Sequence, residues 1–434
     1  MSAHGNRPGS RGAPLPAGFA SLWVTVAVDL VGFGIVLPIL PIYAKRFHAS
    51  SFEAAMLVAA FSAASFVASP LWGRLSDRVG RRPVLVVSLV GTAAGSLLTG
   101  LAGGLALLFV GRVVDGLSGA SVAVAQASVA DLAPPDQRAR LFGLLGAAFG
   151  VGFVAGPAIG ALSGIAGPRV PFLVAAGLAG LNAVLTAARL PETKTPGPAR
   201  LSPSPGPGRR GPFLHAGPDV AGLVGLAFVA MVAFSAFEAT FSLWGRVHLG
   251  LRISSAAAVF AGVGAVIVVV EGGLIGPVTA RLGAMGTLRA GLALTVAGLA
   301  ALAGARSWVL AGPALGLLAA GQGLVQPTMS SVLAGRADPR RRGELLGAQR
   351  SAGGLARVAG PALGGAVLGA GASGLPFALG AALTAGALAG MVVLGRRKAL
   401  VGPEPSFEDA SIRGDGVRSH GDRRGAGPPP RGDP

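Results

Sequence analysis

Three ionisable residues stand inside long apolar stretches of the first third of the chain. Asp29 comes ten residues after Phe19, where such a stretch begins, so a helix would carry it about 15 Å from that end. Arg112 and Asp115 lie three positions apart and therefore on one helix face. A charge at such depth in an apolar helix marks an ion path, a substrate path or a partner. We expect Asp29 to exchange protons and Arg112 to tune it, while Asp115 pairs or shares the proton; the alternative is a structural Arg112–Asp115 pair.

The second half of the chain offers a carboxylate among aromatic rings. Glu238 stands beside Phe237 and three positions before Phe241. A carboxylate near aromatic faces suits a cationic or amphiphilic compound, which it attracts through charge and cation–π contact. We therefore expect substrate contact at these three residues, with helix packing as the alternative for the two rings.

Further polar residues lie in apolar stretches of both halves. Glu271 and Arg350 each stand about 10 Å from the end of their stretch, so we expect them to form a structural pair. Arg357 follows Arg350 by seven positions and shares its helix face, which makes it a candidate for substrate contact. Four glutamines are expected either to line the cavity or to hydrogen-bond neighbouring helices: Gln126, Gln322, Gln326 and Gln349.

The elements that must position these residues are long apolar helices. Of the 434 residues 52% are hydrophobic and 12% are charged, about half the charge of an ordinary soluble protein. A helix of about 20 apolar residues crosses the ~30 Å hydrocarbon core of a bilayer. Twelve stretches reach that length, which predicts an all-α membrane protein: 19–43, 53–73, 84–103, 105–132, 141–164, 170–190, 219–245, 254–278, 286–305, 308–335, 343–369 and 374–395.

The first six stretches are repeated by the last six. The segment AGPAIG at 155–160 recurs as AGPALG at 359–364, and GRLSDRVG at 73–80 corresponds to GPVTARLG at 276–283. A nearly constant offset indicates a duplication, and two related halves are typical of transporters with a site at their interface. The expected parts are a disordered N-terminal segment, two pseudo-symmetric six-helix halves, a Pro-rich cytoplasmic linker and a disordered cytoplasmic tail, at 1–18, 19–190, 219–395, 191–218 and 396–434 respectively.

The charge distribution indicates an orientation. The net charge is +18, and most Lys and Arg fall in the tail and in the loops that share a side with both termini. The positive-inside rule then places both termini in the cytoplasm, and the surplus charge meets anionic lipid rather than nucleic acid. Arg far outnumbers Lys and Gly is abundant, which suggests a GC-rich bacterial genome. We therefore expect a multi-pass protein of the bacterial cell (inner) membrane.

Several kinds of chemistry are excluded by composition. The chain has no Cys, its histidines show no metal-ligand spacing, and it contains no phosphate-binding loop. We therefore expect no metal, no cofactor and no enzymatic activity, with a proton gradient as the energy source. The expected oligomeric state is a monomer.

Four motifs carry a family resemblance. The segment GRLSDRVGRRP at 73–83 resembles the signature loop of the major facilitator superfamily. The segment 29–41 is similar to the first-helix motif of twelve-helix drug/proton antiporters, and 111–120 to their fourth-helix basic motif. A fifth-helix motif associated with antiporters matches at Gly152, Gly156, Pro157 and Gly160, although Ala161 follows where a second Gly is usual. From Phe19 to Gly395 the chain resembles bacterial tetracycline/proton antiporters.

The resemblance implies a conformational lock at the signature loop. Asp77 is expected to approach the start of span eleven and Arg81 to pair with Asp131, so that the halves are latched in the outward-open state. Gly73, Arg78 and Gly80 complete the motif. The second copy has Ala280 at the position of Asp77, so its latch should be weaker or absent.

Together these observations predict a major facilitator fold and a secondary active transporter. It is expected to export a small amphiphilic drug-like compound or metabolite in exchange for protons, by rocking of the two halves between alternating access states. Two alternatives remain at this point: a proton-coupled uptake porter of the same fold, and a membrane sensor or enzyme that does not transport.

Overall fold

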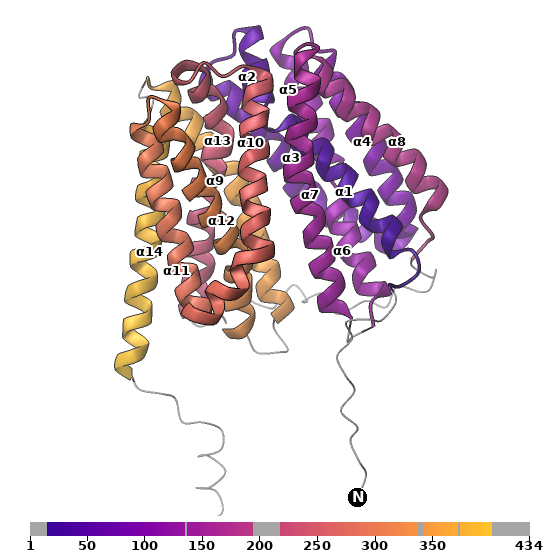
Figure 1. Cartoon of the computed structure of the whole chain (residues 1–434). Helices are drawn as coiled ribbons and strands as arrows, with labels where there is room; N and C mark the ends of the chain where they lie inside the picture. The colour runs from indigo at the N-terminus through magenta and orange to yellow at the C-terminus, as the bar shows by residue number, and fades with distance from the viewer. Residues whose placement is uncertain (1–14, 135–136, 194–217, 337–341, 372–373, 402–434) are drawn as a thin grey trace, which may run out of the picture. The chain divides into compact units, whose positions relative to one another are not determined.

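The computed structural model describes residues 15–134, 137–193, 218–336, 342–371 and 374–401. Every regular element within these ranges is a helix (Figure 1). The elements are α1 (Phe19–Val36), α2 (Leu40–Ala44), η1 (Lys45–Phe47), α3 (Ser51–Val79), α4 (Arg81–Gly100), α5 (Leu105–Leu117), α6 (Ser121–Leu132), α7 (Arg138–Ile165), α8 (Val170–Arg189), α9 (Pro218–His248), α10 (Ile253–Val269), η3 (Val270–Leu274), α11 (Ile275–Gly304), α12 (Trp308–Arg336), α13 (Arg342–Gly369) and α14 (Leu375–Val401).

The twelve predicted spans are recovered when one double-length segment is divided and α13 is counted. Within the described residues, ten helical segments are long and apolar enough to cross a membrane. One of them, Ile253–Gly304, has 52 residues, which is about twice the length that a single crossing needs. The 28-residue α13 is not among the ten, and it carries Arg350 and Arg357 within its length. Dividing the long segment and adding α13 gives twelve spans.

The long segment divides at Gly283, where the backbone turns sharply. Its φ of 68° and ψ of 167° interrupt the helical run inside α11. Gly80, its counterpart in the first half, has φ 109° and ψ 160° and separates α3 from α4. Positive φ with extended ψ is a region that glycine reaches without a Cβ clash. Each half therefore makes the same turn with one glycine.

The first signature motif is thus mostly helix, which corrects our expectation of a loop. Residues Gly73 to Val79 are the last two turns of α3, and Arg81 already begins α4. The helix extends beyond the apolar stretch because Arg74, Ser76 and Asp77 are compatible with a helix that leaves the membrane. The turn itself is a single residue, Gly80.

Two further spans are interrupted. Span one breaks between α1 and α2, where Pro38 and Pro41 remove helical hydrogen-bond donors. Span four breaks between α5 and α6 although it contains no proline. The prolines in the sequence explain the first break. The second break has no such signal in the sequence and is seen only in the structure.

Helix packing repeats between the halves, as the sequence duplication predicts. α1 packs against α7 in the first half and α9 against α13 in the second. Likewise α4 packs on α5, and α11 on α12. The halves meet through the related pairs α3 with α13 and α10 with α7. This exchange of equivalent helices is what a pseudo-two-fold axis between two duplicated halves produces.

Glycines allow a close helix crossing at equivalent places in the two halves. On α7, a Cβ at Gly156 would lie 2.6 Å from the carbonyl oxygen of Val31 on α1. On α13, a Cβ at Gly360 would lie 2.6 Å from the carbonyl oxygen of Val232 on α9. Small residues spaced four apart let helix backbones approach in this way within a bilayer. The fifth-helix motif, with Gly152, Gly156, Pro157 and Gly160, therefore forms the α1–α7 crossing.

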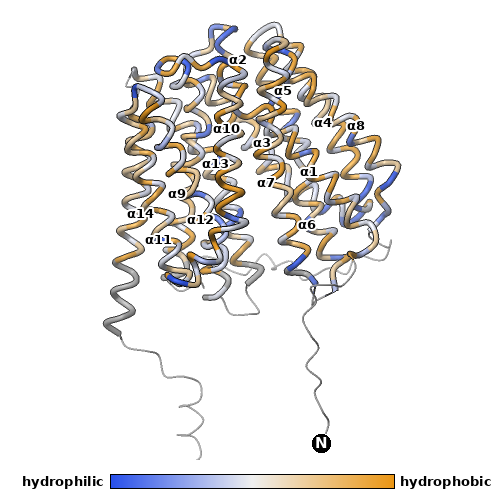
Figure 2. Tube along the Cα trace, in the orientation of Figure 1, coloured by the Kyte–Doolittle hydropathy of each residue, from blue (hydrophilic) through white to orange (hydrophobic). Residues whose placement is uncertain are grey.

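Hydropathy follows the helices along their length. Apolar residues occupy most of each helix, and hydrophilic residues gather towards the helix ends and connections (Figure 2). By contacts the chain divides into two units, Met1–Ala389 and Gly390–Pro434. All sites below lie in the first unit. The linker and tail expected at 191–218 and 396–434 lie mostly outside the described residues, as does the N-terminal segment, so those boundaries stay predictions.

Candidate functional site

Asp29 lies on α1 beside the broken span four. Its side chain is half-buried, and its Oδ2 atom accepts a hydrogen bond from the hydroxyl of Ser121, the first residue of α6. The next residue on α1, Leu30, is the contact of Gly152 at the α1–α7 crossing. The carboxylate is therefore fixed by a hydroxyl donor where three helices meet.

Arg112 and Asp115 form a buried ion pair. Their side chains are 2.9 Å apart, and both are almost fully buried. The guanidinium also lies 5.8 Å from the ring centre of Phe61 and 3.4 Å from the hydroxyl of Thr99. Among the described residues no contact joins Arg112 to Asp29, whose carboxylate is bonded by Ser121. The tuning of Asp29 by Arg112 stays a prediction. Asp115 remains within electrostatic reach of Asp29.

Glu238 and Arg357 approach each other in the second half. The Glu238 carboxylate is buried, while the Arg357 side chain is one-third exposed, and their nearest atoms are 3.9 Å apart. That distance is the upper limit for an ion pair, so each group retains capacity for another partner. α9 and α13, which carry the two residues, are packed closely through Gly360.

Phe237 and Phe241 belong to the helix packing rather than to a surface. Both are at most 1% exposed, and their ring centres lie 5.3 Å apart. Phe260 of α10 packs on both rings, and Phe377 of α14 packs on Phe237. The two rings therefore have the packing role that the sequence left as an alternative. They do not form a binding surface beside Glu238.

Arg350 bridges the two halves and does not pair with Glu271. Its Nη1 atom donates to Oε1 of Gln126 on α6. Glu271 is exposed on the π-helical segment η3, and no partner is found for it among the described residues. The expected Glu271–Arg350 pair is therefore wrong: similar depth along two helices does not bring side chains together when their faces differ.

The remaining glutamines divide between helix contacts and burial. Gln326 contacts the sulfur of Met231 at 3.3 Å, and Gln349 donates to Ser330 at 3.2 Å. Gln322 is 4% exposed. Gln326 and Gln349 thus connect neighbouring helices, the second of the two roles that the sequence left open.

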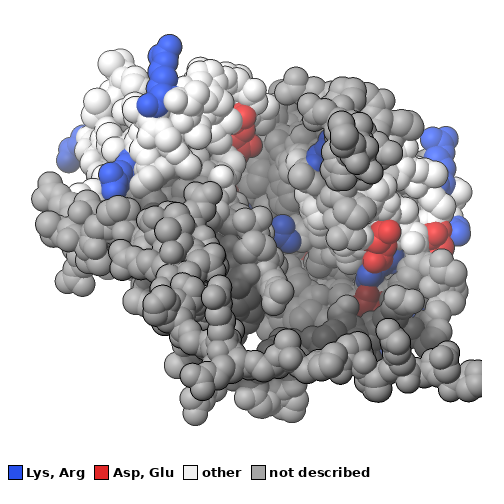
Figure 3. Space-filling view, turned by 90° about the horizontal axis from the view of Figure 1, so that it is seen from below, with Lys and Arg blue, Asp and Glu red and all other residues white. Residues whose placement is uncertain are grey.

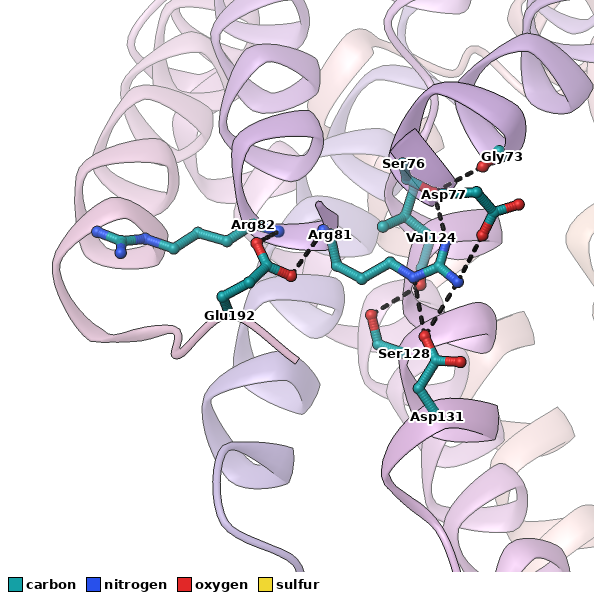
Figure 4. Close-up of polar contacts among 9 residues, drawn as sticks. All are labelled: Gly73, Ser76, Asp77, Arg81, Arg82, Val124, Ser128, Asp131 and Glu192. Carbon is teal, nitrogen blue, oxygen red and sulfur yellow. Dashed lines mark hydrogen bonds and ion pairs between the residues drawn. The ribbon is translucent and has the colours of Figure 1, made fainter. Parts of the chain in front are cut away.

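Arg81 is the centre of a charged cluster at the turn between α3 and α4 (Figure 4). Its Nη2 atom is 2.8 Å from Oδ1 of Asp77 and 3.0 Å from Oδ2 of Asp131, to which Nε also donates. Its Nη1 atom donates to the Ser76 hydroxyl at 2.5 Å. We call Arg81 with Ser76, Asp77 and Asp131 the Arg81 clasp. It ties the end of α3 to the start of α4 and the end of α6.

A glutamate that the sequence argument missed completes this region. The carboxylate of Glu192 accepts the main-chain N–H groups of Arg81 at 2.9 Å and Arg82 at 3.1 Å. These are the first amides of α4, which lack partners within the helix, and an anion is favoured there. The signal available in the sequence was weak: one acid directly after span six, at the edge of a basic, Pro-rich segment.

Three other motif residues have simpler surroundings. Gly73 lies inside α3 and Arg78 is exposed. A Cβ at Gly80 would lie 2.6 Å from Oε2 of Glu192. The predicted approach of Asp77 to the start of span eleven involves side chains outside the described residues and stays a prediction. In the part of the chain that is described, no group of His, Asp or Glu could hold a metal ion.

Comparison with known proteins identifies the family. The model of the Major Facilitator Superfamily matches residues 22–361, most of the described helices. The chain belongs to the Major Facilitator Superfamily. It is accordingly a multi-pass membrane transporter and not an enzyme, as the motifs predicted.

Among its relatives are bacterial drug-resistance proteins. The chain is 34% identical to the class C tetracycline resistance protein of Escherichia coli over 369 residues, which cover 83% of this chain and 92% of that protein. It is 32% identical to the class G protein of Vibrio anguillarum, with 77% and 86% covered. The resemblance to drug exporters noted from the motifs thus extends over most of the chain.

Solved structures agree on the fold. A human organic anion transporter superposes with a TM-score of 0.65 at 23% identity, covering 86% of this chain and 98% of that one. A bacterial homologue of the human lysosomal transporter Spinster, in an inward-facing and occupied conformation, gives 0.70 at 15% identity, with 89% and 98% covered. At these identities the likeness supports the major facilitator fold alone.

Proposed function

We propose that this transporter exports a small amphiphilic compound with a cationic group in exchange for protons, and that Asp29 carries the proton. The observation that carries the proposal is the placement of Asp29, an acid within span one that no cation neutralises among the described residues. Arg112, the basic residue expected from the sequence to tune Asp29, pairs with Asp115 instead. Relatives named for tetracycline and drug resistance support export as the direction.

The two forms of Asp29 supply the coupling. An acid in an apolar helix must be neutral or hydrogen-bonded when it is closed off from water. A proton that binds from one side therefore favours one state of the two halves, and its release on the other side favours the second state. Substrate and proton bind in alternation in this proposal, so the two move in opposite directions.

Substrate recognition is assigned to Glu238 and Arg357. Their separation of 3.9 Å leaves each able to accept a substrate group, and Arg357 is one-third exposed. A cationic group would be drawn by Glu238, and the apolar part of the compound by the surrounding helices. Replacing Glu238 with Gln should weaken cationic substrates more than neutral ones.

The Arg81 clasp serves as the conformational lock. It joins α3, α4 and α6 within the first half and so makes their ends move together, while Asp77 retains more than half of its side-chain surface for a contact outside this cluster. The excess of Lys and Arg in the loops on one side supports a cytoplasmic location for both termini. The Arg81 clasp then lies at the cytoplasmic end.

Direction is tested by transport into inverted membrane vesicles under an imposed pH gradient, acid inside. Tetracycline and a panel of cationic dyes serve as probes. The proposal predicts accumulation that requires the gradient and is lost in Asp29→Asn, with Ser128→Ala as a control that retains it. Accumulation that instead requires the opposite gradient, acid outside, would establish a proton-coupled uptake porter.

A further inference from the structure

Span four is interrupted at Ser118, Gly119 and Ala120, between α5 and α6. The hydroxyl of Ser118 donates to the carbonyl oxygen of Val114 at 2.8 Å, and the main-chain N–H of Ala120 donates to the carbonyl of Ser118 at 2.7 Å. Serine bonds to the preceding turn and small residues in sequence are known causes of helix bending. The span breaks without proline for this reason.

Neighbouring helices satisfy the backbone groups that the break leaves open. Ser88 of α4 accepts the N–H of Ala120 at 3.2 Å and donates to the carbonyl of Ser118. The indole of Trp72 on α3 donates to the carbonyl of Leu117 at 2.6 Å. Because buried backbone groups are costly when unpaired, these contacts stabilise the broken form of the span over a continuous helix.

The break determines what Asp29 meets. α6 begins anew at Ser121, whose side chain is 2% exposed and whose hydroxyl donates to Oδ2 of Asp29. The free N–H groups and partial positive charge of a helix N-terminus also favour an anion at this position. In a continuous helix the first turn of α6 would have no free N–H groups.

We infer that Ser121 is a positioning residue for Asp29, held in place by the break in span four, and that its hydrogen bond sets the pH at which Asp29 exchanges its proton. The inference rests on the proposed role of Asp29. A hydroxyl that donates to a carboxylate stabilises the ionised form relative to the protonated form.

Few other charges act on Asp29. α1 packs on α6, α7 and α8. The described ionisable residues of these three helices lie at or next to helix ends: Asp131, Arg140 and Arg189. From α5, Asp115 interacts with Asp29 electrostatically, and its partner Arg112 offsets that effect. The hydrogen bond from Ser121 is therefore the direct contact that favours the ionised form of the Asp29 carboxylate.

The test follows the protonation of Asp29 itself, without transport. Dicyclohexylcarbodiimide reacts with protonated carboxyl groups, so site-resolved labelling of the purified full-length protein against pH, measured by mass spectrometry, gives a midpoint for Asp29. Ser121→Ala should move this midpoint to higher pH by about one unit, a tenfold change in the ratio of the two forms. Ser121→Thr retains the hydroxyl and should move it by less than about a third of that amount.

Ser128→Ala is the matched control. Ser128 lies on α6 and is fully buried, and among the described residues its hydroxyl bonds to the carbonyl of Val124 in its own helix alone (Figure 4). In Ser128→Ala the labelling midpoint of Asp29 should equal that of the parent protein. An unchanged midpoint in Ser121→Ala, or an equal shift in Ser128→Ala, would overturn the inference. Proton-coupled transport that persists in Asp29→Asn would overturn the proposed function instead, whatever the labelling of Ser121→Ala gives.

Discussion

The same one-residue turn occurs twice in this molecule, at Gly80 and at Gly283, with very different surroundings. Both glycines have positive φ and extended ψ, and both join neighbouring spans. At Gly80 the turn is enclosed by the Arg81 clasp and by Glu192. At Gly283 the corresponding contact is neutral, a hydrogen bond of 3.3 Å between Thr287 and Thr279.

The difference separates what the turn needs from what function adds. One glycine and a pair of hydroxyl groups are enough to reverse the chain, as the second half shows. The charged side chains around Gly80 are additional, and they connect α3, α4 and α6. Of these helices, α6 also carries Ser121, which bonds to Asp29. In Figure 3 acidic and basic side chains lie next to one another at the right of the view, on the first half. At the left, on the second half, the coloured side chains are mainly basic.

The largest expected effect comes from removing Arg81. Its side chain is 6% exposed and neutralises Asp77 and Asp131, which are about half and one-third exposed. Arg81→Ala should lower the free energy of unfolding by about 2 kcal/mol, less than for a fully buried pair, and reduce transport at least about tenfold. Arg281 is exposed in the second copy of the motif. Arg281→Ala should therefore change the free energy of unfolding by no more than about 0.5 kcal/mol and leave transport nearly unchanged. Thermal unfolding in detergent and vesicle transport measure the two; equal losses in both variants would remove the distinction between the turns.

The two turn glycines give the next effect. Gly80→Ala and Gly283→Ala both force alanine into a strained region, at about 1–3 kcal/mol each. At Gly80 the new Cβ would also meet Oε2 of Glu192 at 2.6 Å, whereas at Gly283 nothing lies within 4 Å. We expect Gly80→Ala to be less stable than Gly283→Ala by about 1 kcal/mol, the value of a helix-capping contact. In a Glu192→Ala background this difference should disappear.

The smallest effect comes from adding the missing ions to the second copy. Ala280→Asp with Ala284→Arg would place an acid and a base four residues apart across Gly283, as Asp77 and Arg81 are across Gly80. The structure has no equivalent of Asp131 among the described residues near this turn, so a pair alone should stabilise by at most about 0.5 kcal/mol. Transport should stay within about twofold of the parent. A strong gain in stability would mean that the second turn already has a hidden partner for such a pair.

The sequence predicts the layout of this molecule well because lipid imposes simple rules on it. Length and hydropathy are enough to predict twelve spans, and the repeated segments are enough to predict two related halves. The break at 118–120 was not predictable, because it depends on Ser88 and Trp72 from other spans rather than on a local proline.

Side-chain partners were harder to predict than spans. Arg350 bonds Gln126 instead of Glu271 because the depth of a residue along a helix is visible in sequence while the face it presents is not. Glu192 and Ser121 carry no signal stronger than an isolated polar residue. In contrast, the pairing of Arg81 with Asp131 followed from a motif whose spacing is shared by a family.

The most direct test of the account is proton movement linked to substrate in proteoliposomes that contain the purified protein. With tetracycline or a cationic dye as the probe, the parent should move protons opposite to the substrate. Asp29→Asn should abolish that proton movement while still allowing substrate to equilibrate down its gradient, and Asp29→Glu should restore at least part of it. Proton movement in Asp29→Asn equal to that of the parent would contradict the assignment of the proton to Asp29 and with it the central claim.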